Sequence, residues 1–365
     1  MTKKIFSLIL ILAMVFSLAA CGDSGREKLE AKEGYTIYTD DLGHEVQIID
    51  NPENLSTVFA VATHWACMYG LADNVVSITQ GNTRDFLLLE MFPQIADKKI
   101  VKGNNTFNFE ELVSDPVPHV VFTNPEGVAD EETISKLADL QIPVYVQSYA
   151  DFEDQMKTAK DMGIIVGKEA EAQKYVDYYK KTVDLVEERV AKIPEKDRKT
   201  VYHAINEFLR TDKPGTISET VFDAAGAINV TKDMVSDQEI SLTSKSYISV
   251  EELMQSNPEY IFINGGDVWD YIEGSPQYHN LQAYQNGNIY MLPLGVSRWG
   301  HPTAIETPLA TLFVAKTLYP EQFEDIDIRK EVKYFYKEMF EYDLSEEQVD
   351  KIMGGRAYKE IKGGR

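Results

Sequence analysis

The chain has 365 residues and a formal net charge of −23, which arises from 59 acidic and 36 basic side chains. This length predicts two domains. The acidic surplus excludes a basic surface for nucleic-acid phosphates and a basic amphipathic helix for membrane surfaces. Only two cysteines are present, so a disulfide-stapled scaffold and a cysteine-rich zinc module are excluded as well.

The N-terminus has the pattern of an export signal. Lys3 and Lys4 precede an apolar stretch from Ile5 to Leu18, and small residues lead up to Cys21. The apolar stretch is shorter than the roughly 20 residues that a transmembrane helix needs. Residues 1–20 are therefore predicted to be a signal peptide. In a plain cleavable signal Cys21 would be incidental.

The sequence from Leu18 to Cys21 is similar to the lipobox of bacterial lipoproteins. This resemblance implies that the chain is cleaved before Cys21 and that lipid is attached to this cysteine. Residues 21–34 would then be a lipidated tether that holds the protein at the outer, extracytoplasmic face of the cell membrane. In a host with an outer membrane, this location is the periplasm.

Residues 35–50 are predicted to form a β-hairpin with its turn at Asp41-Leu-Gly43. Beyond the hairpin, the chain contains an internal repeat. Asn108-Phe-Glu-Glu-Leu112 leads to an apolar strand that ends at Asn124, and Ser249-Val-Glu-Glu-Leu253 leads to a similar strand that ends at Asn264. Each copy predicts a capped short helix followed by a buried strand.

Two further pairs of predicted strands keep nearly the same spacing. Thr57-Val-Phe59 matches Thr200-Val-Tyr202, and the strand at Tyr145 matches the strand at Tyr290. Three matches in the same order predict an α/β fold made of two similar lobes with parallel sheets. The N-terminal lobe is assigned to residues 35–166 and the C-terminal lobe to residues 195–355.

One long helix is predicted between the lobes, in residues 167–194. Apolar residues recur there every three or four positions from Ala172 to Ile193, and Pro194 ends the pattern. We therefore expect a rigid connection and not a flexible linker.

Terminal helices are predicted at the end of the C-terminal lobe. One covers residues 329–339, and the next begins with a capping box at Ser345-Glu-Glu-Gln348 and ends before Gly354. Residues 356–365 are predicted to be a disordered tail.

Sequence motifs of the common enzyme classes are missing. The chain has no GxxxxGK[ST], GxGxxG, GxSxG or HExxH pattern, and its six histidines are scattered. Cys67 is interpreted as a buried, unreactive thiol. The protein is therefore not expected to be an enzyme. An exported, lipid-anchored enzyme remains an alternative for which no reactive group of residues can be assembled.

Candidate ligand-binding residues gather after the predicted strands. Doubly wound sheets bind ligands outside the carboxyl ends of their strands, and all three tryptophans fall there, next to polar side chains. Aromatic side chains with a few polar anchors suit a flat or bulky ligand. The predicted ligand-binding residues are His64, Trp65, Asn124, Tyr149, Glu207, Trp269, Arg298, Trp299 and His301.

Local structural roles are the alternative for several of these candidates. Trp65 and Trp269 could close the cores of their lobes, and Asn124 could cap the helix that follows it. Nearby, Glu306 is interpreted as a helix cap that forms a box with Thr303.

The charge and identity of the ligand are open at this point. Arg298 is the clearest anion-binding candidate. Arg84 and Arg210, on predicted loops, could contribute to binding the same anion. Haem would use a histidine as its axial ligand. Direct binding of a metal ion would require three or four converging ligands. His64 and His301 are the candidates for the axial ligand of haem. His64, Glu207 and His301 are the candidates for the ligands of a metal ion.

The lipobox, the repeat and the single long connecting helix together resemble the substrate-binding proteins of bacterial ABC importers. The resemblance is to the class with a helical hinge that carries iron–siderophores, haem and cobalamin. The stretches Ala283–Tyr290 and Leu318–Phe323 are also similar to this class. The resemblance covers nearly all of residues 35–355 and implies two Rossmann-like lobes with a ligand cleft between them. It implies no resident cofactor.

The same resemblance implies the partners of the protein. The ligand would be a metal chelate, in the first place a ferric siderophore, with haem or a corrinoid as the alternative. The ABC permease, which works with its ATPase, would dock through one acidic residue per lobe. By position these are Glu132 and Glu273, which are separated by the same interval as Asn108 and Ser249 at the starts of the repeat. The protein is expected to be a monomer without a nucleic-acid partner.

Overall fold

A computed structural model describes residues 30–103, 107–128, 131–211, 215–234, 246–301 and 304–355. The predicted signal peptide, Cys21 and the predicted tail at residues 356–365 lie outside these ranges. Within the described residues, no helix combines the length and the apolar character needed to cross a membrane.

The described chain begins with the expected β-hairpin. Strand β1 (Tyr35–Thr39) pairs antiparallel with β2 (Glu45–Ile49). The Asp40 carboxylate closes the turn, because its Oδ1 accepts hydrogen bonds from the backbone N–H groups of Leu42 and His44 at 3.0 and 2.8 Å.

The N-terminal lobe is built on a five-stranded parallel sheet with the order β5-β4-β3-β6-β7. Helices connect its strands, as parallel pairing requires. The strands are β3 (Leu55–Thr57), β4 (Val75–Thr79), β5 (Lys99–Lys102), β6 (Val120–Thr123) and β7 (Val144–Val146). The helices are α1 (Ala60–Met68), η1 (Gln80–Arg84), α2 (Phe86–Met91), η2 (Pro93–Asp97), α3 (Phe109–Leu112), η3 (Pro125–Val128) and α4 (Glu131–Asp139).

The C-terminal lobe is built on a four-stranded parallel sheet with the order β10-β8-β12-β13. Its strands are β8 (Thr200–Ala204), β10 (Ile228–Asn229), β12 (Tyr260–Ile263) and β13 (Ile289–Met291). A small antiparallel pair, β9 (Arg210–Thr211) and β11 (Ser246–Tyr247), lies beside it. The helices are η4 (Glu195–Asp197), α7 (Ile217–Ala224), α8 (Val250–Ser256), α9 (Gly266–Glu273), η5 (Pro276–Asn280) and α10 (Gln282–Gln285).

The two sheets reproduce the internal repeat. Strands β3, β6 and β7 are neighbours in the first sheet, and their sequence matches β8, β12 and β13 are neighbours in the same order in the second. The short helices before β6 and β12 are capped as expected. Asn108 accepts the N–H of Glu111, and Ser249 forms a full capping box with Glu252.

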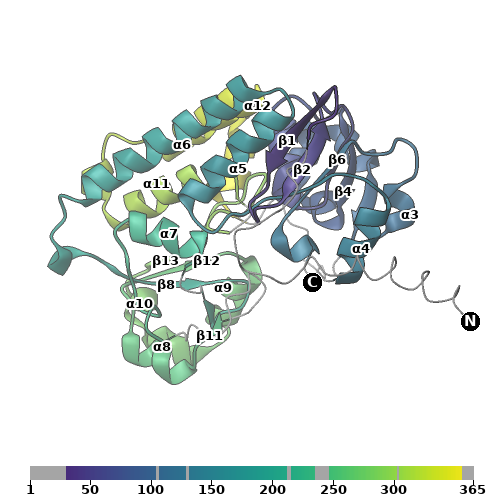
Figure 1. Cartoon of the computed structure of the whole chain (residues 1–365). Helices are drawn as coiled ribbons and strands as arrows, with labels where there is room; N and C mark the ends of the chain where they lie inside the picture. Colours follow the sequence, from purple (N-terminus) through teal and green to yellow (C-terminus); the bar gives the residue numbers. More distant parts are fainter. Residues whose placement is uncertain are drawn as a thin grey trace, which may run out of the picture.

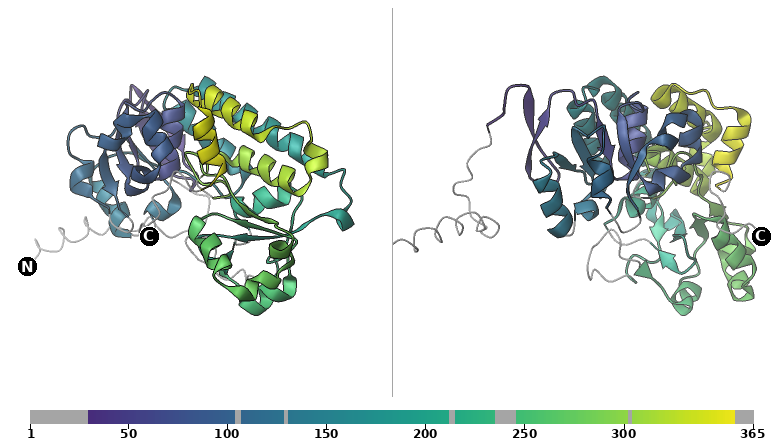
Figure 2. Two further views of the ribbon diagram at one scale, coloured as in Figure 1. Left: turned by 180° about the vertical axis from the view of Figure 1, so that it is seen from behind. Right: turned by 90° about the vertical axis from the view of Figure 1, so that its right-hand side faces the viewer.

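A layer of long helices joins the lobes (Figure 1). Helix α5 (Phe152–Ile165) leads into α6 (Glu169–Val190), the predicted connecting helix, whose 22 residues span about 33 Å at 1.5 Å per residue. After the second sheet the chain returns to this layer through α11 (Thr307–Leu318), η6 (Pro320–Phe323) and α12 (Ile328–Phe340). Helices α11 and α12 pack against α6, and the view from behind shows the layer above the C-terminal sheet (Figure 2).

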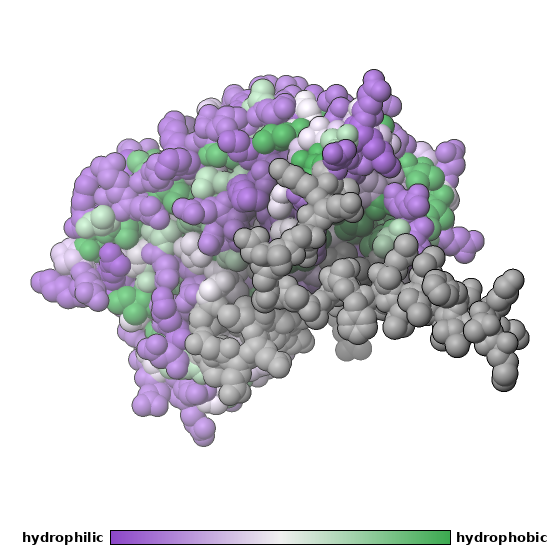
Figure 3. Space-filling view, in the orientation of Figure 1, coloured by the Kyte–Doolittle hydropathy of each residue, from purple (hydrophilic) through white to green (hydrophobic). Residues whose placement is uncertain are grey.

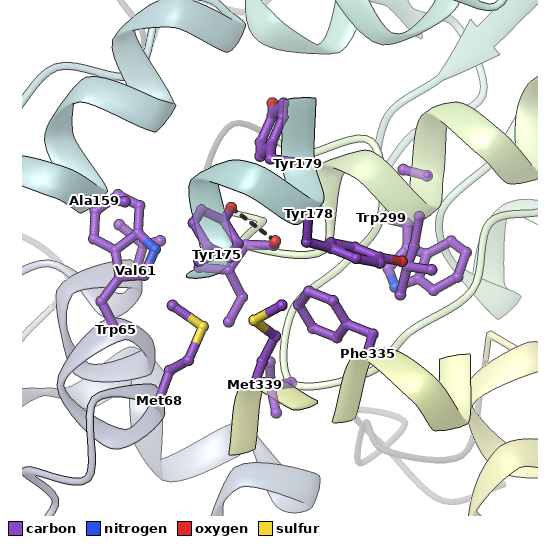
Figure 4. Close-up of a cluster of buried hydrophobic side chains, with 14 of the residues drawn as sticks. Val61, Trp65, Met68, Ala159, Tyr175, Tyr178, Tyr179, Trp299, Phe335 and Met339 are labelled. Atoms are coloured by element: carbon purple, nitrogen blue, oxygen red, sulfur yellow. Dashed lines mark hydrogen bonds between the residues drawn. The ribbon is translucent and has the colours of Figure 1, made fainter. Parts of the chain in front are cut away.

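One face of the connecting helix belongs to the largest apolar core among the described residues. This core includes residues of the N-terminal lobe, of α5 and α6, and of α11 and α12. Tyr175 of α6 is fully buried at its centre, with Trp65 and Met68 of the N-terminal lobe on one side and Phe335 and Met339 of α12 on the other (Figure 4). The hinge and the N-terminal lobe therefore share one continuous core.

The terminal helices contact both lobes. Helix α13 (Glu346–Met353) begins with the predicted capping box of Ser345 and Gln348. Gln348 Nε2 also donates to Glu90 Oε1 of the N-terminal lobe at 2.8 Å, and the rings of Phe340 and Phe92 lie 6.2 Å apart. The end of the chain thus reinforces the contact between the hinge layer and the first lobe.

On the face shown in Figure 3, hydrophilic side chains dominate the described surface, and small hydrophobic patches are scattered among them. This distribution agrees with the large acidic surplus of the chain. Most apolar side chains are buried, either in the continuous core or in two smaller cores on the outer faces of the sheets.

The close contact of α5 with α6 predicts a large effect of Gly163→Ala. A Cβ at this position would lie 2.3 Å from the Cβ of Ala172 and 3.0 Å from the carbonyl oxygen of Lys168. Alanine gains about 1 kcal/mol in helix propensity, but forced separation of the helices costs about 1–3 kcal/mol. We expect a lower free energy of unfolding in urea. Gly274→Ala, whose nearest neighbour would be 3.3 Å away, is the control. Equal stability of wild type and Gly163→Ala would contradict the tight contact.

Candidate ligand-binding site

The candidate site lies at the carboxyl ends of the two parallel sheets, where this type of fold binds ligands. Loops leave the N-terminal sheet after Thr57, Thr79 and Thr123, and leave the C-terminal sheet after Ala204, Ile263 and Met291. Charged side chains of both lobes act on Arg298, in the loop that follows β13. The two edges therefore contribute to one site.

A buried polar network supports the edge of the N-terminal sheet. Thr63 Oγ1 lies 2.8 Å from Thr57 Oγ1 and donates to Asn82 Oδ1 at 2.9 Å. Asn82 Nδ2 donates to Asp85 Oδ2 at 3.0 Å, and His64 Nε2 lies 2.9 Å from the same oxygen. The side chain of His64 is 2% exposed and that of Asp85 is 21% exposed. The network thus presents Asp85, and not His64, to the surface.

Asparagines organise the loops at both edges. Asn124 has the local role considered above, since its Oδ1 accepts the N–H of Gly127 at 3.0 Å. The equivalent residue Asn264 does not cap the following helix. Its Oδ1 accepts the N–H of Asn206 at 3.0 Å, which connects the loops after β12 and β8. Asn206 in turn accepts a hydrogen bond from the guanidinium of Arg298.

Arg298 lies at the centre of a group of charges. Its own partial burial lowers the pKa of its guanidinium, and the positive charges of Arg210 and Arg84 lower it further. Asp85 and Asp267 act in the opposite direction. The three arginines come from both lobes, but Arg84 ends η1 and Arg210 lies in β9, whereas both were predicted on loops. Their three positive charges outnumber the two carboxylates that act on Arg298.

The structure corrects the expectation that tryptophans and Tyr149 line the cleft. Trp65 and Trp299 have no exposed surface, and Tyr149 is 2% exposed. Tyr149 stacks on Phe59 and contacts Trp65 inside the core, because α1 is buried on all sides. Trp269 in α9 is partly buried and packs against the outer core of the C-terminal lobe. Trp65, Trp299 and Tyr149 are therefore core residues, and Trp269 keeps part of its surface exposed.

The structure also corrects the proposed set of direct metal ligands. His64 is bound to Asp85, and Glu207 is exposed and accepts the hydroxyl of Tyr247 at 3.0 and 3.1 Å. His301 is partly buried next to Arg298, to whose carbonyl its N–H donates. Across the described ranges, no three His, Cys, Asp or Glu side chains are grouped so that they could hold a metal ion.

The two acidic residues expected to contact a permease lie on the surface. Glu132 is in the first turn of α4, with its side chain 76% exposed in an ion pair with Lys136. Glu273 is exposed at the end of α9, and its carbonyl lies 3.2 Å from His279 Nε2. Each follows the strand of the repeat that the sequence predicted.

Glu306 is a residue whose role the sequence did not indicate. It is the N-cap residue of α11, but its side chain makes no capping hydrogen bond, and Thr303 lies outside the described residues. Its Oε2 instead accepts the N–H and the hydroxyl of Ser297 at 2.9 and 2.7 Å, and its Oε1 accepts the hydroxyl of Tyr336 at 2.6 Å. Burial raises the pKa of Glu306, although these hydrogen bonds oppose the rise.

Comparison with known proteins agrees with this arrangement of two α/β lobes on a helical hinge. Residues 56–294 match the family model described as "Periplasmic binding protein". The chain belongs to the periplasmic binding protein family. Its two lobes and helical hinge agree with the class of substrate-binding proteins that the sequence indicated.

Individual members of this family are distant relatives. The molybdate-binding protein MolA of Haemophilus influenzae is 24% identical over 330 residues, which are 83% of this chain and 90% of MolA. A periplasmic solute binding protein from Veillonella parvula superposes with a TM-score of 0.75 at 22% identity, over 88% of this chain and 97% of that chain. The vitamin B12 binding protein BtuF of Vibrio cholerae superposes with a TM-score of 0.59 at 17% identity, over 74% and 98%.

The raised pKa of Glu306 predicts a pH dependence of stability. A carboxyl group with a higher pKa in the folded than in the unfolded protein binds its proton more tightly when folded. Its contribution to the free energy of unfolding therefore falls as the pH rises from the ordinary value of 4.5 through the raised value. Tyr175 and Tyr336, the titratable neighbours, are phenols and stay protonated in this interval. In urea unfolding, the wild type should therefore lose stability relative to Glu306→Gln as the pH rises through this range.

Glu259→Gln is a control with the opposite sign. Partial burial would raise the pKa of Glu259, but hydrogen bonds from Thr200 and Lys199 lower it overall. The wild type should therefore lose stability relative to this variant as the pH falls. Parallel curves for wild type and Glu306→Gln would show that the pKa of Glu306 is not raised.

Proposed function

We propose that this protein captures an anionic metal species between its lobes and delivers it to the permease of its importer. An anionic ferric siderophore is the first candidate for the ligand. The observation that carries this proposal is the group of Arg84, Arg210 and Arg298 in a chain of net charge −23. Such a chain repels anions overall, so an anionic ligand needs a local concentration of positive charge.

The environment of the arginines favours recognition of oxygen atoms. Arg298 and Arg210 are partly buried, where Coulomb interactions are stronger than in water. The guanidinium group offers several donors in a fixed plane, which suits carboxylate, catecholate and oxyanion oxygens. Asp85 and Asp267 offset part of the positive charge, so the site is suited to a ligand that replaces these partners.

A flat macrocycle such as haem or a corrinoid is less well supported. Of the aromatic side chains expected to stack on it, Trp65, Tyr149 and Trp299 are buried in the core, and Trp269 is partly exposed. A ligand with charged oxygens on its surface fits the remaining polar edge better than a ligand that requires an exposed aromatic platform.

A small metal oxyanion such as molybdate is the second candidate. The similarity to MolA, over 83% of this chain, favours it. Arg298 and the amide groups of Asn206 and Asn264 could surround an oxyanion of this size from the C-terminal lobe.

The remaining parts of the proposal concern attachment and delivery. Lipid on Cys21 would keep the protein at the extracytoplasmic face of the membrane, next to the permease and its ATPase. Glu132 and Glu273 would form the contacts with the permease, one from each lobe. Both are exposed and follow β6 and β12 at similar distances along the chain, Glu132 in the first turn of α4 and Glu273 at the end of α9.

Arg298→Ala tests the anionic ligand directly. Residues 26–365, without the anchor, would be titrated by calorimetry with an anionic ferric catecholate, sodium molybdate, haemin and cyanocobalamin. We expect the ferric catecholate to bind and Arg298→Ala to weaken its binding about 10- to 100-fold, because hydrogen bonds from charged groups contribute about 1.5–3 kcal/mol.

The control for this experiment is Arg329→Ala. Arg329 is an exposed arginine of α12 that pairs with Glu346 and Asp350, so the variant should keep the wild-type affinity. Tight binding of haemin or cyanocobalamin alone, or an unchanged affinity of Arg298→Ala, would overturn the proposal of an anionic ligand. Binding of molybdate alone would select the second candidate.

Reversal of charge at both docking residues tests delivery. The double variant Glu132→Lys with Glu273→Lys should keep its ligand affinity and lose uptake in cells, because both residues would contact the permease and neither is among the charged groups that act on Arg298. Glu188→Lys with Glu347→Lys, at two other exposed glutamates, is the control and should transport normally. Normal uptake by the first double variant would discard these docking residues.

A further inference from the structure

Glu306 occupies an unusual position for a carboxylate. Its side chain has no exposed surface, and within the described part of the chain no ion pair joins it to a lysine, arginine or histidine. Burial of a carboxylate without a cation is costly unless hydrogen bonds replace its hydration. Three donors do so, and two of them belong to Ser297, the residue directly before Arg298.

The contacts continue on the other side of Ser297. The N–H of Val296 donates to the hydroxyl of Tyr336 at 2.8 Å, and this hydroxyl donates to Glu306. Gly295 lies so close that a Cβ there would be 1.8 Å from Glu306 Oε1 and 2.2 Å from the hydroxyl of Tyr336. The loop from Gly295 to Ser297 therefore packs directly against the carboxylate of Glu306.

The segment around Glu306 is in turn fixed to the hinge helices. The carbonyl of Ala304 accepts Gln155 Nε2 of α5 at 2.8 Å, and the carbonyl of Ile305 accepts the hydroxyl of Tyr175 of α6 at 2.9 Å. Tyr336 belongs to α12 of the same layer. Glu306 thus connects the loop of Arg298 to three helices of the hinge layer.

We propose that Glu306 is a positioning residue for Arg298, which holds the guanidinium at the ligand site by fixing Val296 and Ser297 on the hinge layer. Glu306 itself does not contact the ligand, because it is fully buried. The identity of the ligand rests on the proposed function above, but the position of Arg298 can be measured without any ligand.

The experiment compares Glu306→Leu, Glu306→Gln and Tyr336→Phe with Glu259→Gln. Glu259 is a matched control that directly precedes β12, at the amino ends of the strands of the C-terminal sheet. It also accepts a backbone N–H and a hydroxyl from one residue, Thr200, at 3.0 and 3.3 Å. Circular dichroism would establish that each variant is folded at the temperature of the assay.

The first readout is the labelling rate of Arg298 by phenylglyoxal in the ligand-free protein, measured by peptide mass spectrometry. The exposed Arg329 serves as internal reference. The second readout is the affinity for an anionic ferric catecholate. We expect Glu306→Leu to change both about tenfold, with faster labelling and weaker binding. Glu306→Gln keeps an acceptor for Ser297 and should recover most of the effect, while Glu259→Gln should match the wild type.

A purely structural role of Glu306 would lower stability and leave both readouts of the folded protein unchanged, which would overturn the inference. If Glu306→Leu does not fold, Tyr336→Phe decides by the same labelling, because it removes the hydroxyl between Val296 and Glu306. If labelling changes as expected but the wild type does not bind the ferric catecholate, the positioning role stands and the ligand proposal fails.

Discussion

The candidate ligand site of this protein depends on the apolar core that packs against the buried face of the connecting helix. A helix that merely linked two lobes would allow them to separate, whereas Tyr175 and its neighbours on α6 are packed between the N-terminal lobe and α12 (Figure 4). Protein cores are dense and resist deformation. The carboxyl edges of the two sheets are therefore held at a defined separation, and side chains from distant parts of the sequence can form one site.

Under the proposed function, this arrangement explains how an acidic protein would attract an anion. Most of its negative charge lies on exposed side chains, where water and salt screen it. Arg84, Arg210 and Arg298 come from η1, from β9 and from the loop after β13, and the partial burial of Arg210 and Arg298 strengthens their field. Asp85 is held by Asn82 and His64, and its charge also acts on Arg298. The site thus combines cations with their counter-charges, and a ligand must compete with the latter.

The features of the fold that could be predicted from the sequence are those that depend on local patterns. Capping boxes, the apolar period of α6 and the matching segments that begin at Asn108 and Ser249 all have short-range causes. The placement of Trp65 could not be predicted in the same way. It follows β3, where ligand-binding residues are expected, but α1 is buried all round and shows no polar face to distinguish core from cleft.

The arrangement of the charged side chains could not be predicted from the sequence either. Arg84 and Arg298 belong to different lobes and lie far apart along the chain, and only the packing of the lobes on the hinge brings their charges together. Glu306 shows a similar limit. Its place before α11 suggested a cap, but its partners are Ser297, in the loop after β13, and Tyr336, which lies one helix further along the chain.

The affinity of the wild-type protein for ferric chelates of similar size and different charge tests the central claim most directly. Calorimetric titrations with an anionic ferric tris-catecholate and with a cationic ferric trihydroxamate would be compared at low and at physiological ionic strength. If the arginines capture the ligand, the anionic chelate binds more tightly, and its affinity falls as salt is added. Tighter binding of the cationic chelate, or equal affinities that do not respond to salt, would contradict the account.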